Sequence, residues 1–212
     1  FTGDEVPLRA AKCYFIGSHE DELSTLWLED LSSAPQPPWN LEQFVTTANH
    51  IRQFNGHHLA NKTKLPIDVL IDSYISRLKK DDRSSIADEL VQNRDTEVVR
   101  TAYAESSIES SIQLFKLIDQ LAEAGKHVQH GLAFGDTHSR NMFPVGDKTV
   151  GIDWGTVGME PLGSDIGVLL GSPLSYGIQE ATLVIQSERQ IYDSYVDGLR
   201  SRGWTGNDNE LR

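Results

Sequence analysis

Apolar and polar positions divide the chain into two regions with different periodicities. In residues 1–31 the apolar positions fall in short runs, and we predict strands at 11–16 and 25–28 on either side of a polar turn. Residues 32–38 include three prolines within four positions, which exclude a helix or a central strand there. We therefore place a boundary between the first region and the rest of the chain after residue 31.

Beyond this boundary the apolar residues mostly follow helical spacing. The first of these helices has a capping-box start, because Gln43 follows Asn40 by three positions. The predicted helical segments are 41–51, 66–78, 82–103, 108–125, 162–171 and 178–200. Between them lie an apolar run at 132–134 and two predicted strands, 141–145 and 148–154, joined through Gly146-Asp147 as a hairpin. Strands and helices that are segregated in this way predict an α+β fold.

Charge and composition exclude several classes of partner. The chain has 212 residues, and 31 acidic against 19 basic residues give it a net charge of −12. This balance argues against nucleic acid and against anionic membrane surfaces as partners. The longest apolar runs also fall short of the roughly 18 residues of a membrane span. Cys13 is the only cysteine, which suits a reducing compartment, and we expect a cytoplasmic protein.

The residues best suited to catalysis or metal binding cluster around the predicted hairpin. A loop at 134–141 carries Asp136 and Asn141, and the hairpin folds Asp153 back toward Asn141. Carboxylate and amide oxygens are hard ligands that suit Mg²⁺. A further carboxylate, Asp165, follows in Gly163-Ser164-Asp165. The alternative is that these residues only stabilise turns, since Asp and Asn favour loops by forming hydrogen bonds with their own backbone.

These residues carry a resemblance to a known family. Asp136-x-x-x-x-Asn141, followed by Ile152-Asp153-Trp154 and Gly163-x-Asp165, resembles the aminoglycoside phosphotransferase and choline-kinase-like family. The segment 26–31 resembles the hinge between its two lobes, and the resemblance covers residues 20–200. It implies a protein-kinase-like fold, with a partial small β lobe at 1–31 that ends in the hinge. A mainly helical C-terminal lobe at 32–212 would carry the catalytic loop and the metal-binding hairpin.

The resemblance also implies an activity, the transfer of the γ-phosphoryl group of ATP to a hydroxyl of a small molecule. Asp136 would be the catalytic carboxylate, and His138 would place a cation opposite the γ-phosphate. Asn141 and Asp153 would hold Mg²⁺ against the ATP phosphates. Such chemistry depends on positioning and on neutralising charge.

Three further residues would support this site rather than react. Asp165 would brace the catalytic loop through backbone N–H groups. Glu29 and Leu31 would present backbone groups to adenine.

The chain departs from the family pattern at several points. Phe134 stands where the family has a histidine two residues before the catalytic Asp, and Arg140 stands where a small residue is common. No glycine-rich phosphate loop and no paired Lys and Glu precede the hinge. We therefore expect both ends of the protein to be missing from this chain, with on the order of 50 residues absent at the front.

Two alternatives to an active kinase remain open. The departures above also suit a nucleotide-binding pseudokinase or regulatory domain without turnover. His130, Asp136 and His138 could instead form the zinc site of a hydrolase, although this leaves Asn141 and Asp153 unexplained. We expect Trp27 and Trp154 to be core aromatics in either case.

Overall fold

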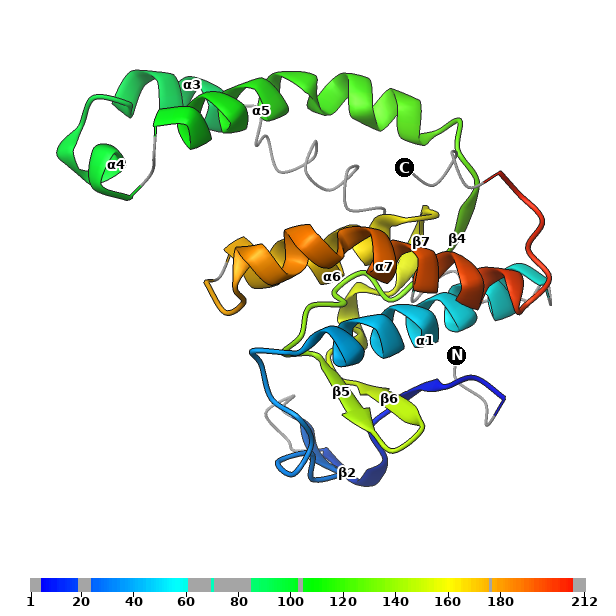
Figure 1. Ribbon diagram of the computed structural model, residues 1–212. Coiled ribbons are helices and arrows are strands. Elements are labelled where there is room, and N and C mark those ends of the chain that lie inside the picture. The colour runs from blue at the N-terminus through cyan, green and yellow to red at the C-terminus, as the bar shows by residue number, and fades with distance from the viewer. Residues whose placement is uncertain are drawn as a thin grey trace. The chain divides into compact units, whose positions relative to one another are not determined.

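The computed structural model describes residues 5–18, 24–60, 70, 85–102, 105–175 and 177–207. The chain divides into two compact units, Phe1–Ile71 with His130–Arg212, and Asp72–Gln129. Small sheets and long helices occupy separate parts of the chain, as an α+β fold requires (Figure 1). The lobe boundary after residue 31 stays a prediction.

The larger unit contains all the described strands. These are β1 (Leu8–Ala10), β2 (Cys13–Ser18), β3 (Ser24–Leu28), β4 (His130–Ala133), β5 (Met142–Val145), β6 (Lys148–Gly151) and β7 (Gly158–Pro161). Its helices are α1 (Leu41–Ala60), α6 (Ser164–Ser175) and α7 (Ala181–Arg200), and a short 3₁₀ helix covers Trp154–Thr156. The strands form three sheets, with the orders β1-β6-β5, β2-β3 and β4-β7.

The central sheet contains the predicted hairpin. β5 and β6 pair antiparallel around Gly146, with Met142 opposite Gly151. The second strand ends at Gly151 rather than at residue 154, because the backbone turns away at Asp153 into the 3₁₀ helix. The periodicity missed β1, which pairs parallel to β6, because three residues are too few to show an alternation.

The core of the larger unit lies where α1 packs along α7 (Figure 1). α1 begins with the predicted capping box: the Asn40 N–H donates to Gln43 Oε1 at 2.8 Å, and the Gln43 N–H donates to Asn40 Oδ1 at 3.0 Å. The largest apolar side chains buried in this core are Leu8, Trp39, Phe44, Ile51, Phe54, Leu132, Phe134, Met142, Ile166, Leu169, Ile191 and Tyr195. One of them, Phe134, belongs to the loop after β4, so the core packs directly against the loop that carries the candidate site.

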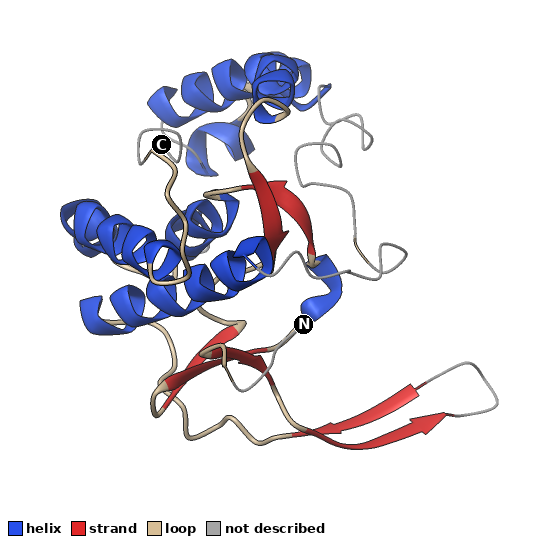
Figure 2. Ribbon diagram, turned by 90° about the vertical axis from the view of Figure 1, so that its right-hand side faces the viewer, coloured by secondary structure: helices blue, strands red, loops and turns tan. Residues whose placement is uncertain are grey.

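The β2–β3 hairpin extends away from this core (Figure 2). Its apolar side chains are exposed on both faces, with Ile16 and Leu26 on one and Phe15 and Trp27 on the other. Trp27 is 65% exposed and contacts Phe15 edge-on, so its predicted core position was wrong. The pattern could not anticipate this, because apolar alternation says which residues share a face and not what covers that face.

The smaller unit is helical. Its described elements are α3 (Ser85–Asn93), α4 (Glu97–Ala102) and α5 (Glu105–Gly125), with α3 packed on α5. The predicted helix at 82–103 is divided, and the Val99 N–H donates to the hydroxyl of Thr96 at the start of α4. The predicted helix at 66–78 lies outside the described residues apart from residue 70. In the part of the chain that is described, no helix combines the length and the apolar character needed to cross a membrane.

Candidate functional site

The loop between β4 and β5 has a constrained backbone. Gly135 has a φ of 88°, and a Cβ there would lie 2.4 Å from the carbonyl oxygen of Thr156. Only glycine combines that conformation with so close an approach. The Thr156 hydroxyl in turn donates to the Phe134 carbonyl at 3.0 Å. The loop is therefore held against the 3₁₀ helix just before Asp136.

Asp136 and Asn141 contact each other directly. The Asn141 Nδ2 donates to Asp136 Oδ2 at 2.9 Å and to the Asp136 carbonyl oxygen at 3.2 Å. Asn141 is only 8% exposed, so its amide orientation is fixed by these bonds. With Nδ2 committed to Asp136, the amide presents Oδ1 as its remaining polar atom. The carboxylate of Asp136 is thus paired with the amide nitrogen of Asn141 within one loop.

His138 lies against the same carboxylate. Its Nε2 is 3.5 Å from Asp136 Oδ2, and its Nδ1 accepts the Arg140 N–H at 3.2 Å. An accepting Nδ1 assigns the proton of a neutral ring to Nε2, on the Asp136 side. The structure therefore brings Asp136, His138 and Asn141 together.

Asp153 is placed beside this loop by the backbone of the hairpin. The Ile152 N–H donates to the Asn141 carbonyl at 3.0 Å, and Asp153 follows immediately. Among the described residues Asp153 is the only non-glycine with positive φ, at φ 59° and ψ 63°. Such a conformation costs free energy, and non-glycine residues in it concentrate at functional sites. The sequence pattern had predicted Asp153 to lie within the second strand of the hairpin, but β6 ends at Gly151 and the side chain of Asp153 is exposed.

Asp165 lies beneath the loop in a network of hydrogen bonds. Its carboxylate accepts the N–H groups of Phe134 at 3.1 Å and Gly135 at 2.8 Å, and the side-chain amide of Asn55 at 3.0 Å. The Thr137 hydroxyl donates to its carbonyl at 2.5 Å. Burial raises the pKa of Asp165, and these hydrogen bonds oppose that rise. They are backbone contacts of the kind that a bracing role requires.

Sequence reasoning missed the buried cation next to Asp165. Arg52, on α1, has no exposed surface, and its Nη1 donates to the hydroxyl of Tyr195, over whose ring the guanidinium also lies. Burial lowers the pKa of Arg52, while the charge of Asp165 favours its ionised form. The Tyr195 hydroxyl also accepts the Gly163 N–H at 3.1 Å. The signal in the sequence was an arginine on the apolar face of a helix.

Phe134 packs where the family pattern has a histidine. Its side chain is fully buried, and its ring meets that of Trp154 edge-on at 4.7 Å between centroids. A Cβ on Gly151 would lie 2.9 Å from the Phe134 ring. An apolar side chain thus supports the loop by packing rather than by a hydrogen bond.

The predicted hinge residues lie along a cavity of about 390 Å³. Glu29 and Leu31 line it together with Pro144 and Val145 of β5. The Glu29 N–H donates to the Lys12 carbonyl, and the Leu31 carbonyl accepts the Ala34 N–H. Within the described residues, no hydrogen bond takes up the Glu29 carbonyl or the Leu31 N–H. One acceptor and one donor are therefore available at this edge of the cavity.

The Glu29 side chain is engaged in an ion pair that the sequence did not predict. Arg9 donates Nη1 and Nη2 to the two carboxylate oxygens, at 2.6 and 2.8 Å. These bonds, with a further one from the Lys12 N–H, lower the pKa of Glu29 to about 2. The pair ties β1 to the hinge.

The donor set fits a hard divalent cation better than zinc. Asn141 Oδ1 and the exposed Asp153 carboxylate offer oxygen atoms, the kind of ligand that Mg²⁺ prefers. In the described ranges no three His, Cys, Asp or Glu side chains are grouped to hold a metal ion. The alternative zinc site at His130, Asp136 and His138 therefore gains no support from the structure.

Comparison with known proteins identifies the fold. No family model and no curated protein matches this sequence. Among solved structures, an amicoumacin kinase in complex with AMP-PNP and Ca²⁺ superposes with a TM-score of 0.59 at 12% identity. The alignment covers 94% of this chain and 58% of that kinase, so the chain spans little more than half of its length.

A more distant likeness is to aminoglycoside phosphotransferase APH(3'')-Id from Streptomyces rimosus. It has a TM-score of 0.48 at 13% identity and covers 98% of this chain and 72% of that enzyme. The chain shares the fold of the amicoumacin kinase, which confirms the predicted protein-kinase-like α+β fold class.

Proposed function

We propose that the chain is an ATP- and Mg²⁺-dependent phosphotransferase that moves the γ-phosphoryl group of ATP to a hydroxyl of a small molecule. The observation that carries this proposal is the pairing of Asp136 with Asn141 at 2.9 Å, next to an Asp153 held in a left-handed conformation. The kinase-like fold provides the frame for this arrangement. No part of the proposal requires nucleic acid or a membrane as partner.

Each residue has a distinct role in the proposed reaction. Asp136 would accept the proton of the acceptor hydroxyl while the oxygen of that hydroxyl bonds to the γ-phosphorus. The bond from that phosphorus to the bridging oxygen breaks at the same time, and ADP leaves. His138 would present Nε2–H to the transferred group. Asp165 would keep the loop in place through Phe134 and Gly135.

The nucleotide would be held at two points. The Glu29 carbonyl and the Leu31 N–H match the donor and acceptor edge of adenine. Asn141 Oδ1 and the Asp153 carboxylate would hold Mg²⁺, which when bound neutralises charge on the phosphates.

A thermal-shift titration with ATP and Mg²⁺ tests nucleotide binding. At a hundredfold excess over Kd a ligand that binds only the folded state adds about 2.7 kcal/mol, or about 5–10 °C in Tm for a chain of this size. We expect that shift in the chain as printed, and its loss with EDTA or in Asp153→Asn. Asn tolerates the left-handed conformation, so this change removes charge with little strain. Asp147→Asn, at the turn of the same hairpin, is the matched control and should shift like the wild type.

Turnover is measured separately, as ADP release with a panel of small hydroxyl compounds. ADP release that requires both an acceptor and Asp136 would support the phosphotransferase. Nucleotide binding without ADP release from any acceptor would instead identify a nucleotide-binding protein without turnover. An undiminished shift in Asp153→Asn would contradict the proposed metal site.

A further inference from the structure

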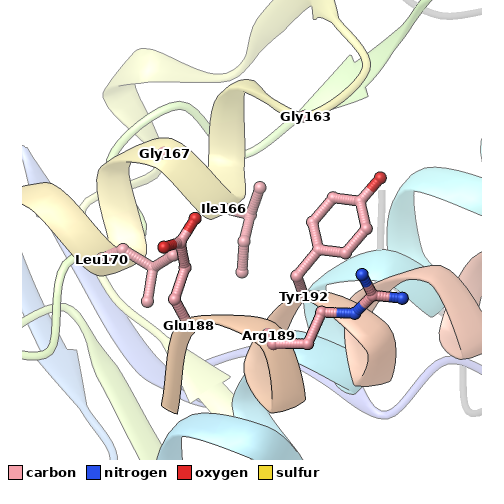
Figure 3. Close-up of a pocket in the computed structure, with 7 residues that line it drawn as sticks. All are labelled: Gly163, Ile166, Gly167, Leu170, Glu188, Arg189 and Tyr192. Carbon is pink, nitrogen blue, oxygen red and sulfur yellow. The ribbon is translucent and has the colours of Figure 1, made fainter. Parts of the chain in front are cut away.

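A cavity of about 630 Å³ lies between α6 and α7 (Figure 3). Ile166, Gly167 and Leu170 of α6 line one side, and Glu188, Arg189 and Tyr192 of α7 line the other. The volume lies in the range of roughly 300–1,000 Å³ that small-molecule sites occupy. All of these residues belong to the larger unit, so the cavity is formed within one compact body.

This cavity is separate from the candidate phosphotransfer site. On α6 the side chain of Asp165 faces the loop that carries Asp136, as its bonds to Phe134 and Gly135 show. Gly167 is two residues further along, or about 200° around the helix axis. The cavity therefore opens on the face of α6 that points away from that loop.

The cavity has an apolar floor and free space above it. Ile166 and Leu170 provide aliphatic surface, and Tyr192 contributes a half-buried ring. A Cβ on Gly167 would meet no other atom within 4 Å. The glycine thus leaves room where any other residue would fill part of the cavity.

The charge of the cavity is negative. Arg189 is neutralised by Asp193, since its Nε lies 2.9 and 3.0 Å from the two carboxylate oxygens of that residue. Glu188 forms no hydrogen bond or ion pair with any residue that the structure describes. Figure 3 shows Glu188 pointing toward Gly167 and Leu170, while Arg189 points away from Glu188. Among the described residues that line the cavity, the exposed Glu188 carboxylate is thus a charge without an opposite partner.

We propose that this cavity is a binding site for a small organic cation, an amine with an apolar or aromatic body. The ammonium group would pair with Glu188, and the body would lie on Ile166, Leu170 and the ring of Tyr192. A carboxylate beside an aromatic ring attracts ammonium groups both by charge and through the ring's negative face. The site needs neither ATP nor Asp136, so its test is independent of the proposed phosphotransfer.

Three probes of matched shape and different charge test the proposal. These are 2-phenylethylammonium, neutral 2-phenylethanol and anionic 3-phenylpropionate, each titrated into the isotope-labelled chain and followed by amide NMR shifts. We expect the cation to perturb the amides of Gly167, Leu170 and Tyr192, and to bind up to about fivefold more tightly than the alcohol. Equal or tighter binding of the alcohol or the anion, or no perturbation at these amides by the cation, would overturn the proposal.

Two pairs of variants locate the site. Glu188→Gln should lower the affinity for the cation to that for the alcohol, while Glu180→Gln, at the start of the same helix, should leave it unchanged. Gly167→Leu should abolish binding by filling the cavity. Gly171→Leu, on the same helix and also in open space, controls for the effect of a new side chain. Unaltered binding in Glu188→Gln or Gly167→Leu would also overturn the proposal.

Discussion

Asp165 shows how a single buried carboxylate can organise a reactive loop. It is 1% exposed, and it takes up two backbone N–H groups that would otherwise be buried without partners. Burial raises its pKa, while the hydrogen bonds from Asn55, Gly135 and Phe134 and the charge of Arg52 act in the opposite direction. The same residue therefore links α1, α6 and the loop that holds Asp136.

Replacing Asp165 tests this role. An amide in Asp165→Asn offers only one accepting oxygen, so at least one loop N–H loses its partner. We expect the free energy of unfolding to fall by about 1–3 kcal/mol, measured by urea denaturation. Asp193→Asn removes only the exposed pair with Arg189 and should stay within about 0.5 kcal/mol of the wild type. Equal effects of the two changes would contradict the bracing role.

The ion pair of Arg9 with Glu29 predicts a pH dependence. The pKa of Glu29 falls from 4.5 to about 2 in the folded chain, so the folded state binds this proton less tightly than the unfolded state. Its contribution to stability is then complete above pH 4.5 and declines as the pH falls toward 2. We expect the stability difference between the wild type and Glu29→Gln to shrink through that window.

Chemical denaturation at a series of pH values measures this difference. Glu42→Gln, on the exposed surface of the first turn of α1, is the matched control. A wild-type advantage over Glu29→Gln that stays constant from pH 6 to pH 3 would contradict the assignment.

Among the helices of the larger unit, α1 and α7 approach each other closely. A Cβ on Gly198 would lie 2.5 Å from the carbonyl oxygen of Asn49 and 3.1 Å from the Cβ of Arg52. The backbones of the two helices can approach this closely only because position 198 has no side chain. This packing also fixes Arg52 and Tyr195, which adjoin Asp165.

Alanine at two helical glycines separates helix packing from helix propensity. Gly198→Ala should lower the free energy of unfolding by about 1–3 kcal/mol, because the helices must move apart. Gly171→Ala, inside α6 with open space around it, should raise that free energy by up to about 1 kcal/mol through helix propensity. Thermal or urea unfolding of both variants measures the contrast. A Gly198→Ala variant as stable as Gly171→Ala would show that the helices do not meet at this point.

At the scale of the whole molecule, the net charge of −12 sets the electrostatics. Like charges on a compact chain repel one another, and salt screens this repulsion over a Debye length. The exposed ion pairs contribute little that salt could remove. Added salt should therefore stabilise the folded chain.

We expect Tm to rise by a few degrees between about 0.01 M and 0.3 M NaCl, measured by calorimetry. The double variant Glu42→Gln with Glu180→Gln changes the net charge from −12 to −10 and should show a smaller rise in Tm. A Tm that falls with added salt would indicate that specific ion pairs, rather than net repulsion, dominate.

Much of the fold could be predicted from local pattern. The capping box at Asn40, the hairpin around Gly146 and the helices predicted at 41–51, 108–125 and 178–200 each depend on residues close together in the sequence, and these are present. Errors arose where partners are distant. β7 pairs with β4, and β1 pairs with β6. Strands of three or four residues are too short to show the alternation of apolar and polar residues by which a strand is recognised.

The residues of the candidate site could be recognised from local sequence, because the spacing of Asp136, Asn141 and Asp153 follows from one loop and one hairpin. Tertiary structure alone decided how they are held. The left-handed backbone of Asp153 and the burial of Arg52 beside Asp165 depend on packing between segments far apart in the chain. The exposure of Trp27 and the cavity between α6 and α7 likewise depend on which faces meet, and no local periodicity encodes that.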